Sequence, residues 1–122
     1  MNFSQLLSLA ETVLEETIAE LPDEIRSLAR EVPVLLEKRA EPLEAGIEPD
    51  EVLLGLFEGP DHSEETQISG YHPRISLYLL TLWDFCQRDE DHFRQEVADT
   101  YLHELGHYLG WDEEEIARRG LG

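Results

Sequence analysis

The chain has 122 residues, a length that predicts a single domain, residues 1–122, with one modest hydrophobic core. Its hydrophobic content of 41% excludes a disordered chain, and its formal net charge of −19 argues against nucleic acid and membrane partners, because both need cationic patches. The acidic balance favours metal ions and basic partners, although a soluble, self-repelling surface explains most of the charge.

The first elements in chain order are two helices and two strands. Apolar residues recur at helical spacing from about Ser4, which we expect to be the N-cap, to Leu21. Proline followed by two acids at Pro22-Asp23-Glu24 predicts the first turn of a second, short helix. Residues 32–38 have a β-like pattern, and the continuous apolar run at 52–57 predicts a strand covered on both faces.

Turn-forming residues predict loops at 41–50 and at 59–73. Apolar residues then alternate with polar ones over 74–79, which predicts a third strand, and the pattern becomes helical over 80–87. Cys86, the only cysteine, follows apolar residues and is expected to be a buried thiol without a disulfide partner.

A long helix is expected next, capped by Asp89 or Asp91. Its apolar face is predicted to contain Val97, Tyr101, Leu105 and Tyr108. A last helix is expected from Asp112 to about Arg119. The N-terminus lacks the basic region of a secretory signal and no apolar run reaches membrane-spanning length, so we expect a cytoplasmic protein.

The long helix contains the run His103-Glu104-Leu105-Gly106-His107. Histidines four residues apart lie on one face of a helix, so the two imidazoles can bind a single zinc ion. Glu104 lies about 100° further round the helix, from where it can act on a metal-bound water without being a ligand. This is the H-E-x-x-H arrangement of zinc peptidases.

A third metal ligand is expected just after the second histidine, because a catalytic zinc usually has three protein ligands and a water. Gly110 can adopt the left-handed conformation that ends a helix, and the turn can bring Asp112 or Glu113 back toward the metal. We favour Glu113. The same residues also fit a simpler interpretation, a glycine that ends one helix and acids that begin the next.

Further residues are candidates for supporting roles, each with a structural alternative. Asp99, one turn before His103, could orient an imidazole or could be a solvated helix acid. A third histidine ligand could come from the loop, although surface histidines are commoner: His62 and His72 are the candidates. The donors that could stabilise an oxyanion are Tyr71, His72, Arg74, Tyr78 and Tyr108, of which Tyr78 is equally explained as a strand residue and Tyr108 as core.

Three segments of the chain resemble the bacterial minimal zincin-like metallopeptidase family: 54–59, 74–78 and 96–113. The family pattern H-E-x-x-H-x-x-G-x-x-(D/E) implies zinc ligands at His103, His107 and Glu113, with Glu104 as the catalytic base. Aspartate is usual at the last position, and Glu113 is one methylene longer. The resemblance implies an α+β fold, a small mixed β-sheet packed by helices, with the motif on the long C-terminal helix of a reduced zincin core.

The resemblance implies hydrolysis of a peptide or protein substrate by a metal-activated water. The alternative is a non-catalytic metal- or peptide-binding module, because so short a chain leaves little material for specificity pockets. A closed structural zinc site is disfavoured, since Glu104 would have no role in it. A metzincin would need histidine at position 113 and a methionine turn, and the only methionine is Met1. The sequence leaves the substrate and the oligomeric state open.

Overall fold

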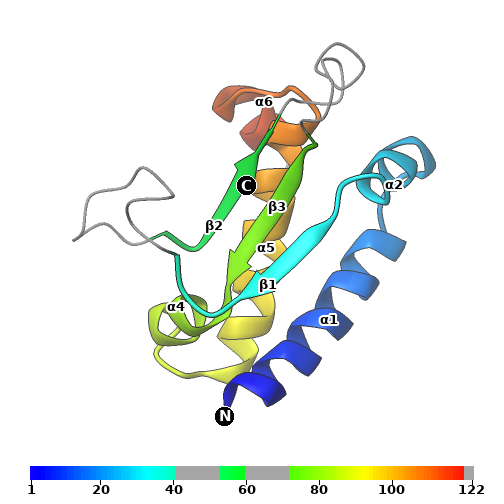
Figure 1. Ribbon diagram of the computed structural model, residues 1–122. Helices are drawn as coiled ribbons and strands as arrows, with labels where there is room; N and C mark the ends of the chain where they lie inside the picture. Colours follow the sequence, from blue (N-terminus) through cyan, green and yellow to red (C-terminus); the bar gives the residue numbers. More distant parts are fainter. Residues whose placement is uncertain (41–52, 60–71, 120–122) are drawn as a thin grey trace.

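The computed structural model describes residues 1–40, 53–59 and 72–119, so the predicted loop at 41–50 and most of the one at 59–73 lie outside it. The described chain combines helices with a three-stranded sheet, which confirms the predicted α+β class (Figure 1). Its elements are α1 (Phe3–Ala19), α2 (Asp23–Ala29), β1 (Val34–Glu37), β2 (Gly55–Glu58), β3 (Arg74–Tyr78), α4 (Leu79–Phe85), α5 (Glu90–Tyr108) and α6 (Glu113–Arg118).

The sheet is mixed, and its strand order is β1-β3-β2. Strand β1 runs parallel to β3, with Val34 opposite Ile75. Strand β2 runs antiparallel to β3, with Gly55 opposite Leu77. Strand β3 is therefore the centre of the described sheet, and β2 is an edge strand.

The prediction of a strand covered on both faces at 52–57 is wrong in position and in burial. The observed strand is Gly55–Glu58, and its last three residues are only half-buried. The strand buried on both faces is β3, in which even Ser76 is 2% exposed. Composition could not show this, because a strand becomes central through pairing with residues that are distant in the sequence.

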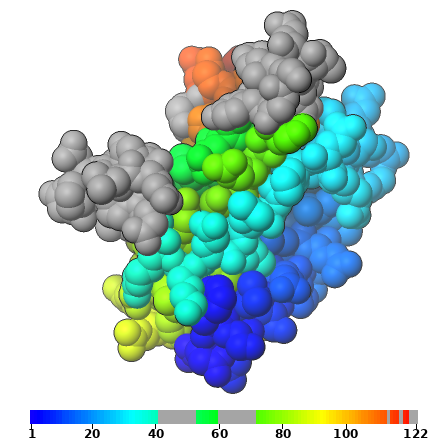
Figure 2. Space-filling view, viewed as in Figure 1, coloured from blue at the N-terminus to red at the C-terminus, as the bar shows by residue number. Residues whose placement is uncertain are grey.

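Helices α1 and α5 pack against each other, and α5 also packs against β2 and β3. Figure 1 shows α5 running behind the sheet with α1 alongside it. In Figure 2, viewed from the same side, the side chains of β1 form a cyan band next to the blue α1. Cys86 is fully buried within this core, as predicted. No helix in the described part of the chain has the length and apolar character needed to cross a bilayer.

The first helix begins two residues earlier than the sequence predicted, because Asn2 and not Ser4 is the N-cap. The Asn2 side chain accepts a hydrogen bond from the Gln5 amide at 2.8 Å, and the Gln5 side chain accepts one from the Asn2 amide at 2.9 Å. This reciprocal pair is a capping box, which satisfies two amides that the helix leaves unpaired. Asparagine is as good an N-cap as serine, so the residue type could not decide between them.

Helix α5 begins as predicted, with the Asp89 carboxylate accepting a hydrogen bond from the His92 amide at 2.8 Å. Its apolar face is fully buried, and the residues with no exposed area are Phe93, Val97, Tyr101, Leu105 and Tyr108. This face fixes the rotation of α5 about its axis. The two histidines of the motif lie to one side of this buried face, where they are half-buried.

Candidate metal centre

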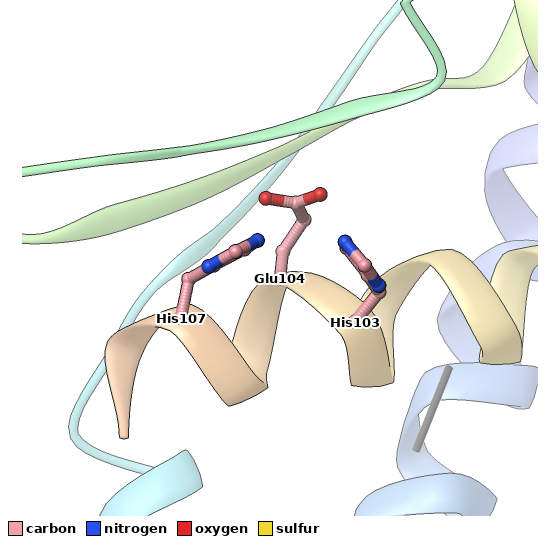
Figure 3. Close-up of side chains that lie close together, drawn as sticks. All are labelled: His103, Glu104 and His107. Atoms are coloured by element: carbon pink, nitrogen blue, oxygen red, sulfur yellow. The ribbon is translucent and has the colours of Figure 1, made fainter. Parts of the chain in front are cut away.

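His103, Glu104 and His107 lie together near the C-terminal end of α5. Figure 3 shows the three side chains rising from one side of the helix toward the strands, with Glu104 between the two imidazoles. Their ligand-capable atoms all lie within 4.8 Å of one another, and the imidazole centroids are 5.0 Å apart. The helical spacing of the motif thus brings two imidazoles and one carboxylate together.

This donor set fits a metal such as zinc. Neutral imidazole nitrogen and carboxylate oxygen are both common zinc donors, and sites with fewer than four protein donors are the catalytic ones. All three side chains are partly exposed, so a solvent molecule or a substrate can reach them. The described residues therefore include a group able to hold a metal ion beside open space.

A pocket of about 540 Å³ adjoins this group. The start of β2 forms one side of the pocket, and the side of α5 that carries His103 and Glu104 forms the other. The lining residues are Leu54, Gly55, Glu96, Asp99, Thr100, His103 and Glu104. Because His103 and Glu104 are part of the wall, a molecule in the pocket would touch the metal-binding group. Asp99, a candidate for orienting an imidazole, accepts a hydrogen bond from the side-chain Nε2 of Gln95 at 2.9 Å.

Strand β2 reaches α5 through a close contact at Gly55. A Cβ atom on Gly55 would lie 2.7 Å from Thr100 Cγ2 and 3.2 Å from the Ser76 carbonyl oxygen. Thr100 has little freedom to move away, since it is 8% exposed and its hydroxyl donates to Glu96 at 3.4 Å. A glycine at position 55 is therefore what allows the edge strand to form a wall of the pocket.

The end of α5 confirms the left-handed turn predicted at Gly110. Gly110 has φ of 82°. Its amide donates to the His107 carbonyl at 3.0 Å, and the Trp111 amide donates to the Gly106 carbonyl at 3.0 Å. These two bonds form a Schellman motif, which satisfies carbonyls that the helix end leaves unpaired. The chain therefore leaves the helix direction directly after the second histidine.

Helix α6 begins at Glu113, three residues after Gly110. The side chain of Glu113 lies outside the described residues, so its assignment as a metal ligand stays a prediction. Asp112 has a visible role, because its carboxylate accepts a hydrogen bond from the Glu115 amide at 2.8 Å and so caps α6. Of the two acids that the sequence offered as third ligand, Asp112 is thus engaged in starting a helix.

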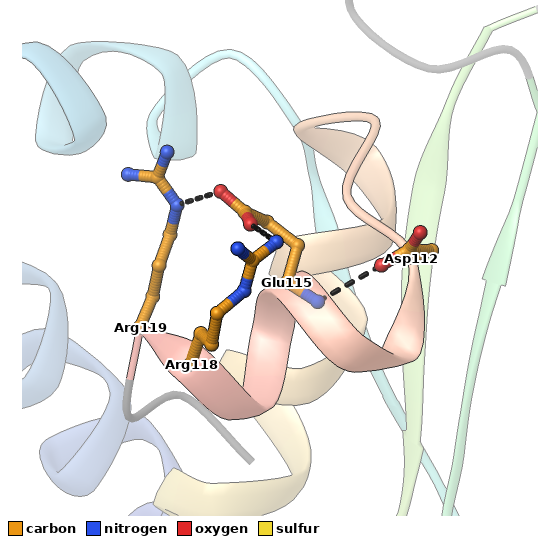
Figure 4. A network of polar contacts seen from close by, with 4 residues as sticks. All are labelled: Asp112, Glu115, Arg118 and Arg119. Atoms are coloured by element: carbon orange, nitrogen blue, oxygen red, sulfur yellow. Dashed lines mark hydrogen bonds and ion pairs between the residues drawn. The ribbon is translucent and has the colours of Figure 1, made fainter.

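Charged side chains form a small network along α6 (Figure 4). Glu115 pairs with Arg118 and also with Arg119, whose Nε lies 2.6 Å from a Glu115 carboxylate oxygen. The Arg119 guanidinium also lies over the Trp111 ring, 4.3 Å from its centroid. The ring of Trp111 therefore links the end of α5 to the last turn of α6.

Three of the four described candidates for stabilising an oxyanion are engaged in the fold: Arg74, Tyr78 and Tyr108. Arg74 pairs with Glu58 across the sheet at 3.0 Å. Tyr78 is 4% exposed, and burial raises the pKa of its phenol. Tyr108 is fully buried, with its ring centroid 5.9 Å from that of Phe57. His72 is exposed two residues before β3, whereas Tyr71 and His62 lie outside the described residues.

Two residues that line the pocket were not predicted: Gly55 and Glu96. A signal for each was present in the sequence. A glycine inside a strand or helix weakens that element and often marks a close approach of another segment. Glu96 lies seven residues before His103, a spacing that places both on one helix face.

Comparison with known families agrees with this geometry. The model of the zincin-like metallopeptidase family matches residues 29–121, from the end of α2 through the motif to the end of α6. A search among curated proteins finds no match. The family match covers more than half of the chain and confirms the resemblance that the sequence motifs indicated.

Proposed function

Because the chain belongs to the zincin-like metallopeptidase family, we propose that it is a zinc-dependent enzyme that hydrolyses peptide bonds of a peptide or protein substrate. The observation that supports this most strongly is that His103, Glu104 and His107 converge beside a pocket. A closed structural site would need neither the pocket nor a carboxylate between its histidines.

The proposed metal ligands are His103, His107 and Glu113. The histidines are fixed by the buried face of α5, and the turn at Gly110 places the start of α6 close behind them. Glu113 is preferred to Asp112 because the Asp112 carboxylate already caps α6. Two imidazoles and one carboxylate give the three protein donors that catalytic zinc sites use.

Bound zinc would lower the pKa of its water to about 7 and would polarise the substrate carbonyl. Glu104 is the proposed general base, because its carboxylate lies between the two imidazoles on the pocket wall (Figure 3). It accepts a proton from the attacking water as the new carbon–oxygen bond forms. It then delivers that proton to the amine nitrogen as the carbon–nitrogen bond breaks.

The test of this function is the substitution Glu104→Gln, which preserves the shape of the side chain but cannot accept a proton. We expect the variant to keep its zinc and to lose at least about 100-fold in peptide cleavage, the range for removal of a general base. Zinc content is measured on purified protein before and after chelation, and cleavage is measured against a peptide library. Glu15→Gln, the same change on the exposed face of α1, is the matched control and should leave both unchanged.

Two outcomes would contradict the proposal in different ways. If Glu104→Gln loses zinc together with activity, Glu104 is a ligand or a structural residue and not the base. If the wild-type protein binds zinc but cleaves no peptide in a broad library, the domain is a metal- or peptide-binding module that has no catalytic function.

A further inference from the structure

We propose that Gly106 is a positioning residue for the metal centre: the absence of a side chain there lets Ile116 seat α6, and with it Glu113, against α5. Gly106 occupies a variable position of the H-E-x-x-H motif, between a buried leucine and a ligand histidine. The inference rests on the proposed function in taking Glu113 as the third ligand. The packing on which it depends is independent of any metal.

The contact between Gly106 and Ile116 is closer than any other residue at position 106 would permit. A Cβ atom on Gly106 would lie 2.6 Å from Ile116 Cγ1 and 2.8 Å from Ile116 Cδ1. Atoms of this kind pack at about 3.5–4.0 Å, so either the Ile116 side chain or one of the two helices would have to shift. Ile116 has little room to turn away, because it is 1% exposed.

A glycine at this point disfavours the helix that contains it. Gly106 lies in the last turns of the 19-residue α5, where alanine would be a better helix former. The carbonyl of Gly106, which accepts from the Trp111 amide, would be present in any residue. Only glycine leaves the space into which the Ile116 side chain fits. That space allows α6 to pack closely against α5.

Helix α6 depends on this one buried side chain. Among its described side chains, Glu114 and Arg118 are exposed, Glu115 is half-buried, and only Ile116 is buried. Residues three apart are neighbours on a helix. A movement of Ile116 away from α5 therefore carries the backbone of Glu113 with it, while His103 and His107 stay in place on α5.

The experiment is a double-substitution cycle with Gly106→Ala and Ile116→Ala, read by zinc affinity from chelator competition. Gly106→Ala should weaken zinc binding about 10–100-fold, the usual effect of removing support from a metal ligand. Ile116→Ala deletes the two clashing carbons and leaves its Cβ 3.6 Å from the added methyl, an ordinary contact. The zinc affinity of the double variant should therefore lie within about threefold of that of Ile116→Ala alone. Two independent sites would instead show additive losses of zinc affinity.

A second readout needs no metal. Hydrogen exchange of the Ile116 and Arg119 amides, which are bonded within and at the end of α6, reports its docking in the metal-free protein. These amides should exchange faster in Gly106→Ala and recover in the double variant. Ala98→Gly, an exchange of the same residue types earlier in α5, is the matched control and should leave zinc affinity and α6 exchange unchanged.

Each result decides the question. Wild-type zinc affinity in Gly106→Ala, or a loss that Ile116→Ala does not rescue, overturns the proposal. If Gly106→Ala fails to fold, recovery of the fold in the double variant supports the contact, and failure of both overturns it. Faster exchange of α6 with undiminished zinc affinity shows that Gly106 packs α6 without serving the metal. The assignment of His103, His107 and Glu104 would stand in all of these cases.

Discussion

Helices α5 and α6 hold the proposed metal ligands in different ways. Helix α5 has 19 residues and packs against α1, α4, β2 and β3 through a fully buried face. Helix α6 has six residues, and of its described side chains only Ile116 is buried. A helix this short is not stable by itself in water, so its position depends on a few contacts. Global stability and metal affinity should therefore respond to different substitutions.

The largest effect on stability is expected from Phe93→Ala, at the far end of α5 from the metal site. Phe93 is fully buried and meets Trp83 edge-to-face at 5.6 Å between ring centroids. Its removal should lower the free energy of unfolding by about 3–5 kcal/mol, as for other buried aromatic residues. Urea denaturation measures the loss, and zinc affinity of the folded variant should stay near that of wild type. A parallel loss of zinc binding would show that α5 does not separate the two properties.

The substitution Glu113→Ala is expected to do the reverse, lowering zinc affinity while leaving the stability of the metal-free protein nearly unchanged. If Glu113 is a ligand, its loss should weaken zinc by at least 100-fold, or about 2.7 kcal/mol, with little change in metal-free stability. Asp112→Ala is the matched comparison: it removes the cap of α6, at a cost of about 1 kcal/mol, and should affect zinc far less. A zinc titration in which Asp112→Ala is the more damaging change would make Asp112 the ligand. If neither substitution matters, the third ligand lies elsewhere, with His62 and His72 as candidates.

The smallest effect is expected from Arg119→Gln, which removes the guanidinium above Trp111 and the ion pair with Glu115. Exposed cation–π contacts are worth about 0.5–1 kcal/mol, so α6 should open somewhat more often without a change in global stability. Hydrogen exchange of the Ile116 amide measures this opening. Arg118→Gln is the control, because Arg118 also pairs with Glu115 but no stacking on Trp111 is observed for it among the described residues. Equal effects of the two variants would rule out a contribution from stacking.

The sequence predicted correctly those features that lie within a single helix or turn. Periodicity and local backbone chemistry predicted the buried face of α5, the turn at Gly110, and an aspartate cap at position 89 or 91. The structure confirms the face and the turn, and it shows that Asp89 is the cap. The grouping of His103, Glu104 and His107 also followed, because helix geometry alone brings them together. Catalysis by Glu104 and ligation by Glu113 stay predictions.

What sequence reasoning could not supply was the placement of one element against another. It made the run at 52–57 a doubly covered strand, whereas β3 is the central strand and β2 the edge. It also left the two close approaches to α5 unrecognised, at Gly55 and at Gly106. Both glycines are conspicuous in their elements, but which partner fills the vacant space depends on the tertiary fold. The missing information was long-range pairing and not local propensity.

The buried thiol of Cys86 can report whether the hydrophobic core unfolds or only α6 detaches. The thiol is fully buried, and burial raises its pKa to about 11, so the reactive thiolate is scarce in the folded protein. Figure 1 shows α4, which Cys86 follows directly, at the opposite end of α5 from α6. Detachment of α6 should therefore leave the thiol protected, and alkylation should proceed only when the core itself opens. The rate of thiol labelling thus measures unfolding of the whole domain, while the amides of α6 record the local release that would disable the metal centre.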